Sequence, residues 1–415
     1  MTINAASAPY KALVLGGSYG GLSAALNLID LCDARPARCG RGDEPPAAEK
    51  ISVDVTIVDE RDGFYHLIGS PLAFASEAYA DKAWVKYEDV VPLQAPNVHV
   101  IQGTVNGVDC SAKTATITES GQTSTRELTY DFLVVASGLR RVFPVVPQSL
   151  RRKMYLFETG DHIRAVTNAT DGVVVVGGGA VGIEMAAELK LLQPNIKVTL
   201  VHSRDKLLSS EGLPDDAKDR ALELVQEAGV ETLMNHRVAD LKETTRSDGQ
   251  TITDIKFTNG ESMTASRVIM AVSRSIPSTT YLPSEALDQE GYVKIQPSLN
   301  FPVEVPNSGH HFAIGDLAAW SGIKRCGGAM HMGYYAASNI HQVMLQQLQG
   351  RDPKFNELAE IPPMIGLAVG KKAMSYGPGQ GVMSGEDVME VFFGDDLGFT
   401  ICWKYLKLGL PIDAK

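Results

Sequence analysis

The apolar residues of this chain gather in short uninterrupted runs, and longer segments of mixed polarity separate them. Such runs are typical of strands that are buried on both faces of a parallel sheet. The runs at 13–15 and 173–176 each lead into a glycine-rich turn and then into small residues that begin a helix. This succession of strand, glycine turn and helix occurs twice, about one domain apart, and it predicts an α/β fold with parallel sheets.

The rest of the pattern predicts how the chain is divided. A polar segment with Pro and Gly at 33–46 is expected to be a surface insertion, and a hairpin is expected at 237–265. Residues from about 355 are expected to form a separate C-terminal unit with strands and a short final helix. Further strands are expected at 53–59, 98–101, 114–117, 132–136, 197–201 and 267–271, and helices near 215–228 and 329–348.

The first glycine turn departs from the Gly-x-Gly-x-x-Gly pattern at one position. Gly16 and Gly21 occupy the first and third glycine positions, Ser18 stands at the second, and Gly20 adds a small residue. Such a turn lets backbone N–H groups approach a pyrophosphate at the helix N-terminus, and a serine hydroxyl can also bind phosphate. The alternative is a tight turn that binds no ligand.

The strand expected at 53–59 ends in a carboxylate. Asp59 stands where such a side chain accepts two hydrogen bonds from an adenosine ribose. Its separation from the glycine turn is longer than the usual ~20 residues, and the insertion accounts for the difference. Glu60 is the neighbouring candidate, and a solvated charge at the strand end is the alternative.

The second glycine turn fits the pattern at all three positions, with Gly177, Gly179 and Gly182. After the next strand, where NAD-binding units place a carboxylate, the chain has His202, Ser203 and Arg204. An arginine and a serine hydroxyl would hold the 2′-phosphate that a carboxylate repels, so the sequence favours NADPH over NADH. Alternatively, Arg204 is a solvated loop residue and either nicotinamide cofactor is used. Two such turns together suggest two dinucleotides held face to face, an arrangement that passes a hydride from a nicotinamide to a flavin.

Charge and cysteine content exclude several classes of protein. The net charge of −11 argues against general affinity for nucleic acid or an anionic membrane. No run approaches the ~20 apolar residues of a membrane span, and the first residues lack the features of a signal peptide, so we expect a cytoplasmic protein without stable membrane insertion. The five cysteines include no Cys-x-x-Cys pair, so no redox dithiol and no metal site are expected. Cys326, which follows Lys324 and Arg325, has a basic neighbourhood that can lower its pKa.

Taken together and in order, these motifs resemble the two-dinucleotide-binding flavoproteins of pyridine nucleotide-disulfide oxidoreductase fold. Within that family the chain is most similar to the apoptosis-inducing-factor-like and ferroptosis-suppressor-like branch and to type II NADH dehydrogenases. The resembling stretches, which cover about 11–350, are 14–21, 61–66, 135–138, 176–184, 198–204 and 313–316.

The resemblance implies two Rossmann-like dinucleotide-binding domains and a small C-terminal α+β unit. The FAD-binding domain would comprise 1–145 and 276–350, the NAD(P)H-binding domain 146–275, and the C-terminal unit 351–415.

The family pattern also assigns roles to single residues. Ser137 and Gly138 stand at the crossing between the two domains, and Gly315 and Asp316 resemble the motif whose aspartate binds the flavin ribityl chain. Glu184 matches a glutamate on the nicotinamide side of the flavin, which in some relatives pairs with a lysine that we cannot place here.

Two histidines are candidates for proton donation. His66 and His331 are expected near the flavin ring, where either could supply a proton to a quinone-like acceptor. For each, the alternative is a histidine that only packs or caps. Glu184 completes the set of catalytic candidates.

These observations predict an FAD-dependent NAD(P)H oxidoreductase. A hydride passes from the nicotinamide to FAD, and electrons then leave to a quinone-like or other small conjugated acceptor or to dioxygen. The alternatives are a tailoring enzyme of a specialised-metabolite pathway and a redox-sensing flavoprotein with slow turnover. The expected partner is a small-molecule electron acceptor, with no nucleic acid, and the protein is expected to be a monomer or a homodimer.

Overall fold

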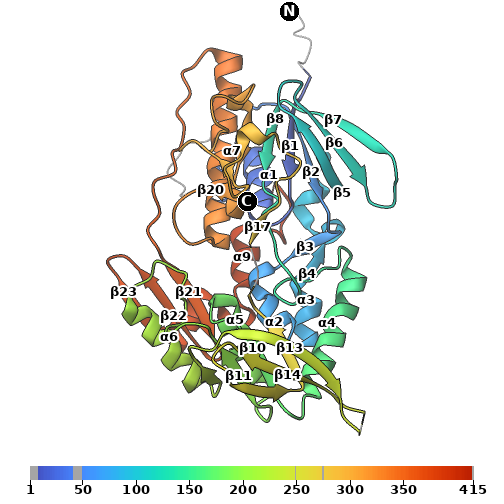
Figure 1. Ribbon diagram of the computed structural model, residues 1–415. Coiled ribbons are helices and arrows are strands. Elements are labelled where there is room, and N and C mark those ends of the chain that lie inside the picture. The colour runs from blue at the N-terminus through green and yellow to red at the C-terminus, as the bar shows by residue number, and fades with distance from the viewer. Residues whose placement is uncertain (1–7, 41–48, 248, 273–274, 414–415) are drawn as a thin grey trace, which may run out of the picture.

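The chain folds into an upper and a lower lobe, each with a parallel sheet, which confirms the predicted α/β class (Figure 1). The structure is a computed structural model and describes residues 8–40, 49–247, 249–272 and 275–413. Within those residues, no helix is both long and apolar enough to cross a bilayer.

The upper lobe is built on a seven-stranded sheet in the order β19-β8-β1-β2-β5-β6-β7. The first strand of the chain, β1, lies near its centre and pairs in parallel with β2 and with β8. Because both faces of β8 are covered, its four residues are all apolar and buried. The bounds are β1 (Tyr10–Leu15), β2 (Val53–Asp59), β5 (Val98–Asp109), β6 (Thr114–Glu119), β7 (Thr125–Thr129), β8 (Phe132–Val135) and β19 (His311–Ala313).

Strand β5 is longer than the sequence pattern predicts because it changes partner along its length. Val98 to Gln102 pair in parallel with β2, and Gly103 to Asp109 pair antiparallel with β6. The antiparallel part covers one face of the sheet, where Ala115 and Ile117 belong to the same core as Leu13 of β1.

The other face of the upper sheet is covered by two helices that touch closely. Helix α1 (Tyr19–Cys32) follows the first glycine turn, and α7 (Cys326–Gln349) crosses it. Ser23 donates a hydrogen bond to the Met330 carbonyl at 2.6 Å, and a Cβ on Gly333 would lie 2.5 Å from the Gly20 carbonyl oxygen. Small residues at the crossing therefore allow the two backbones to meet.

The lower lobe repeats the arrangement with a four-stranded parallel sheet in the order β12-β11-β10-β16. The sheet β13-β14-β15, which is the predicted hairpin segment, packs on one face, and α5 and α6 cover the other. The bounds are α4 (Arg152–Thr167), β10 (Val173–Val176), α5 (Ala180–Leu192), β11 (Val198–Val201), α6 (Asp215–Glu227), β12 (Glu231–Leu233), β13 (Val238–Thr245), β14 (Thr251–Phe257), β15 (Ser262–Ala265) and β16 (Arg267–Met270).

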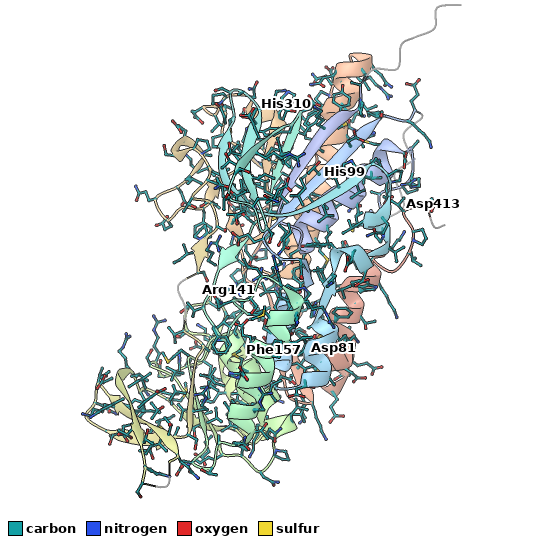
Figure 2. All side chains as sticks on the ribbon, turned by 90° about the vertical axis from the view of Figure 1, so that its right-hand side faces the viewer. Asp81, His99, Arg141, Phe157, His310 and Asp413 are labelled. Carbon is teal, nitrogen blue, oxygen red and sulfur yellow. The ribbon has the colours of Figure 1, made fainter. Side chains whose placement is uncertain are left out.

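Two of the chain crossings between the lobes run side by side. Strands β9 (Leu139–Arg140) and β17 (Ile276–Pro277) pair antiparallel at the junction. Figure 2 shows Arg141, the residue after β9, where the two lobes meet. The remaining elements are β3 (Gly63–Tyr65), α2 (Ser70–Ala73), α3 (Glu77–Ala83), β4 (Trp84–Lys86), β18 (Val293–Lys294) and β20 (Ala318–Ala319).

The C-terminal segment is divided between the two lobes. Leu367 and Met374 of its sheet belong to the core of the lower lobe, whereas Phe399 and Cys402 belong to the core of the upper lobe. The segment thus joins both lobes by burying its apolar side chains in two cores. Its bounds are β21 (Ile365–Val369), β22 (Lys372–Gly377), β23 (Gly381–Gly385), α8 (Glu386–Phe392) and α9 (Phe399–Tyr405).

The predicted insertion is not wholly a surface segment. Arg38 is buried, its Nε bonds the Asp30 carboxylate at 2.8 Å, and its Nη1 donates to the Leu406 carbonyl at 3.0 Å. An arginine can be buried here because its charge is paired and its donors are used. This part of the insertion ties α1 to the end of α9, while 41–48 lie outside the described residues.

The close crossing of α1 and α7 predicts a large effect of a single methyl group. In Gly333→Ala the new Cβ would meet the Gly20 carbonyl oxygen at 2.5 Å and Ser23 Cβ at 2.7 Å, so the helices must separate. We expect a loss of about 1–3 kcal/mol in the free energy of unfolding, measured by urea titration. Gly309→Ala, whose Cβ would meet nothing within 4 Å, is the control. Equal stability of the two variants would contradict this packing.

Candidate active site

The first glycine turn is held in place from both sides. Gly17 N–H donates to Asp59 Oδ2 at 2.6 Å, and the Tyr87 hydroxyl donates to the Gly17 carbonyl at 2.9 Å. Asp59 Oδ1 also accepts from Arg61 N–H at 2.8 Å. Burial raises the pKa of Asp59, and Arg61 and the Gly17 N–H oppose that shift. The predicted ribose ligand is thus also the residue that fixes the turn.

The second glycine turn has the same contact, made by a different side chain. Gly178 N–H donates to His202 Nδ1 at 3.1 Å, just as Gly17 N–H donates to Asp59. Nδ1 must therefore be the unprotonated nitrogen, and Nε2–H faces the Ser209 hydroxyl at 3.0 Å. Burial lowers the pKa of His202, which favours this neutral form. An imidazole thus replaces the carboxylate that NAD-binding units usually have at this strand end.

Arg204 is fixed beside the second turn. Its Nη1 donates to the Ser209 carbonyl at 3.1 Å and to the Ser209 hydroxyl at 3.2 Å. His202 and Arg204 therefore share one partner, and Ser203 lies between them at the end of β11. His202 and Arg204 are thereby held together beside the turn.

The predicted ribityl ligand, Asp316, lies near two basic residues. Arg141 Nη2 is 3.5 Å from Asp316 Oδ2, and burial raises the pKa of Asp316 against the opposing effects of Arg141 and Lys324. Gly315 precedes it with φ of +77°, a conformation that glycine adopts without strain. No motif in the sequence pointed to Arg141, because it reaches this site from the crossing between the lobes.

Ser137 and Gly138 lie at the chain crossing, as expected from the family pattern. The Ser137 hydroxyl donates to the Ser278 carbonyl at 2.7 Å and contacts the Tyr281 hydroxyl at 2.6 Å. Ser278 N–H in turn donates to the Gly138 carbonyl at 3.0 Å. These hydrogen bonds join the segment that leaves the upper lobe after β8 to the segment that returns to it after β16.

Glu184 lies on α5 and faces the C-terminal segment. Its Oε1 accepts from Ala368 N–H of β21 at 3.3 Å, and burial raises its pKa to about 8. The lysine pairing found in some relatives is not made by Lys82, which binds Asp396 at 2.6 Å instead. Among the described residues no cation contributes to the pKa of Glu184, and a pKa of about 8 favours the protonated carboxyl at neutral pH.

His66 is buried with both ring nitrogens in hydrogen bonds. Nε2 lies 2.9 Å from the Leu397 carbonyl, which can only accept, and Nδ1 lies 3.0 Å from the Tyr19 hydroxyl. Burial lowers the pKa of His66 to about 4, so the ring is neutral at pH 7. This geometry favours the packing alternative, in which His66 fastens Tyr19 to the C-terminal segment.

His331 lies in the second turn of α7 and is half-buried. Its ring centroid is 4.2 Å from that of Tyr335, and the two ring planes are inclined at 50°. Its role as a proton donor stays a prediction.

Two cysteines far apart in sequence meet near the first turn of α7. The contact with the Cys402 thiol lowers the pKa of Cys326, against the effect of its burial, and raises that of Cys402. The basic neighbour Arg325 has a smaller effect than this thiol contact. No Cys-x-x-Cys spacing could have revealed the pair.

The backbone at these turns fits dinucleotides. A Cβ on Gly21 would collide with the Gly16 carbonyl, and one on Gly182 would collide with the Gly177 carbonyl. The first turn of each helix therefore packs directly on the glycine turn that precedes it. In contrast, a Cβ on Gly179 would meet nothing within 4 Å, which leaves open space before the N-terminus of α5. A pyrophosphate can approach the unpaired N–H groups of such a helix start. Among the described residues, no group of three or more His, Cys, Asp or Glu is placed to hold a metal ion.

The contact between Gly178 and His202 predicts a specific pH dependence. Because the folded-state pKa of His202 is lowered, its contribution to stability is present above the unfolded pKa of about 6.5 and decreases as pH falls below it. In His202→Asn an amide oxygen can keep accepting from Gly178, so this part of the acid destabilisation should disappear. Urea unfolding between pH 5 and 8 measures it, and identical pH profiles for wild type and variant would contradict the assignment.

Three comparisons place these features among known proteins. The sequence model of the pyridine nucleotide-disulphide oxidoreductases matches residues 10–333. The chain is 53% identical over 408 residues to oxidoreductase OXR1 of Ajellomyces capsulatus, covering 97% of this chain and 88% of that protein. It is 26% identical over 340 residues to mouse ferroptosis suppressor protein 1, covering 81% of each.

A solved structure shares the fold at low sequence identity. The NDH2 of Plasmodium falciparum, in complex with RYL-552, superposes with a TM-score of 0.67 at 13% identity, covering 98% of this chain and 100% of that one. The family implies FAD and a pyridine nucleotide as cofactors. The chain is an oxidoreductase that belongs to the pyridine nucleotide-disulphide oxidoreductase family.

Proposed function

We propose that the protein is an FAD-dependent NAD(P)H oxidoreductase that reduces a quinone-like or other small conjugated acceptor, or dioxygen. The observation that carries the proposal is the matched pair of glycine turns, each anchored through its second residue by a side chain at the end of the next strand. Two such turns in neighbouring lobes provide one dinucleotide site each.

In this proposal the upper lobe holds FAD. The turn with Gly16, Ser18, Gly20 and Gly21 receives the pyrophosphate, Asp59 the adenosine ribose, and Asp316 the ribityl hydroxyls. Asp59 and Asp316 are suited to this role because carboxylates accept hydrogen bonds from sugar hydroxyls. Ser137 and Gly138 keep the crossing between the lobes in place. The first turn of α7 carries Gly327 and Gly328, where a Cβ would meet nothing within 4 Å, so a ring can approach its N–H groups.

The lower lobe holds the nicotinamide cofactor at Gly177, Gly179 and Gly182. We propose NADPH as the preferred form because Arg204 and Ser203 stand beside neutral His202, where NADH-binding units have a carboxylate. The guanidinium is oriented by Ser209 and can bind a 2′-phosphate with charge-assisted bonds.

FAD, when bound, supplies hydride acceptance and the transfer of electrons to the acceptor. A quinone also takes up protons, and the chain must supply or conduct them. Glu184 is suited to this because its carboxyl is half-buried and protonated below about pH 8. His66 is less suited, because both of its nitrogens are used in hydrogen bonds within the protein.

The function is tested by rapid-mixing measurements on the purified flavoprotein. We expect NADPH or NADH to bleach the flavin absorbance within a single turnover, and a benzoquinone to restore it. The quinone step should slow above about pH 8, where Glu184 has lost its proton, whereas reduction by the nicotinamide should not. Protein that binds no flavin, or flavin that neither nicotinamide reduces, would overturn the proposal.

The choice between nicotinamides is tested at Arg204. In Arg204→Glu a charge that attracts the 2′-phosphate becomes one that repels it, so the Kd of NADPH should rise roughly 10–100-fold while that of NADH changes little. Titration of each nucleotide by calorimetry measures this. Lys256→Glu, the same change of charge at an exposed position of β14, is the matched control. Equal losses for the two nucleotides would remove Arg204 from a phosphate site.

A further inference from the structure

The face of α5 that carries Glu184 has a second carboxyl one helical turn later. Glu188 is 2% exposed, and within the described residues its Oε1 has no hydrogen-bond partner. Residues four apart on a helix lie on one face, with Cβ atoms about 6 Å apart. Glu188 therefore stands directly behind Glu184, away from solvent.

Within the part of the chain that the structure describes, no cation offsets the burial of either carboxyl. Glu188 faces Tyr79 of α3, whose hydroxyl already donates to the Asp396 carbonyl at 2.7 Å. Glu184 faces the Ala368 N–H of β21 and, at the start of α7, Cys326. Burial raises the pKa of Glu188 to about 7, and proximity to Glu188 adds to the rise in the pKa of Glu184. Near neutral pH the pair holds at least one proton, because two adjacent buried carboxylates repel each other.

Packing alone does not account for a carboxyl at this position. The neighbours of Glu188 on α5, from Ile183 to Leu189, are otherwise small or apolar except for Glu184. A buried polar atom without a partner is destabilising, a penalty that Met at this position would avoid. The carboxyl differs from an apolar side chain of similar length because it can release and regain a proton.

We propose that Glu188 is a proton reserve for Glu184, the residue that the proposed function assigns to proton supply. After Glu184 gives its proton to the reduced acceptor, the Glu188 carboxyl proton moves to the Glu184 carboxylate, and Glu188 becomes the carboxylate. No electrons move in this step, and solvent later restores the proton. This inference rests on the proposed function. It adds Glu188 as a residue that acts only through Glu184, by returning a proton to it.

The test uses two acceptors that differ in their need for protons. The flavoprotein is reduced anaerobically with NADPH and then mixed with a water-soluble benzoquinone or with ferricyanide, which takes one electron and no proton. In Glu188→Gln we expect quinone reduction to slow roughly tenfold or more, while reduction by NADPH and reoxidation by ferricyanide stay near wild type. Glu188→Asp should recover part of the quinone rate, and Glu243→Gln, at an exposed position of β13, should change nothing.

The outcomes separate the relay from a structural role and from the proposed function. Equal slowing with both acceptors would show that Glu188 only supports the fold and would overturn the relay, as would an unchanged quinone rate and pH profile. A wild-type flavin that no nicotinamide reduces would instead refute the proposed function.

Infrared difference spectra between oxidised and reduced protein give a readout that needs no turnover. A protonated-carboxyl band that disappears in Glu188→Gln supports the relay, and its absence from the wild type contradicts it.

Discussion

The structure depends on how closely a helix can approach the strand that precedes it. In both lobes the first turn of the helix packs against the carbonyl of the first glycine of the turn. The approach is so close that a Cβ at Gly21 or Gly182 would collide with that carbonyl oxygen. Only glycine permits this approach, and the approach leaves the first N–H groups of the helix open to a ligand. The packing constraint and the binding site are therefore one feature of the backbone.

The turns need support, and the two lobes supply it differently. Asp59 and His202 occupy equivalent strand ends and both accept a hydrogen bond from the second residue of their turn. Asp59 brings a carboxylate to its turn, whereas His202 brings a neutral imidazole beside Arg204. One structural need is thus met by two side chains of different charge.

The C-terminal segment determines the environment of the candidate catalytic groups. Strand β21 brings the Ala368 N–H to Glu184, and the loop before α9 brings the Leu397 carbonyl to His66. Cys402 of α9 contacts Cys326 at the start of α7. Because the segment buries apolar side chains in both cores, it fixes the lobes together and places these groups at the same time (Figure 1).

The sequence alone determined the α/β class, the two glycine turns and the strand ends at Asp59 and His202, because backbone requirements of this kind leave a local pattern of glycines and apolar runs. It did not reveal Arg141 beside Asp316, the hydrogen bonds that engage both nitrogens of His66, or the thiol contact of Cys326. It did not single out Glu188, whose burial follows from the packing of α5. Pairing, burial and the resulting pKa shifts depend on residues that are distant in the chain, so only the tertiary structure decided them.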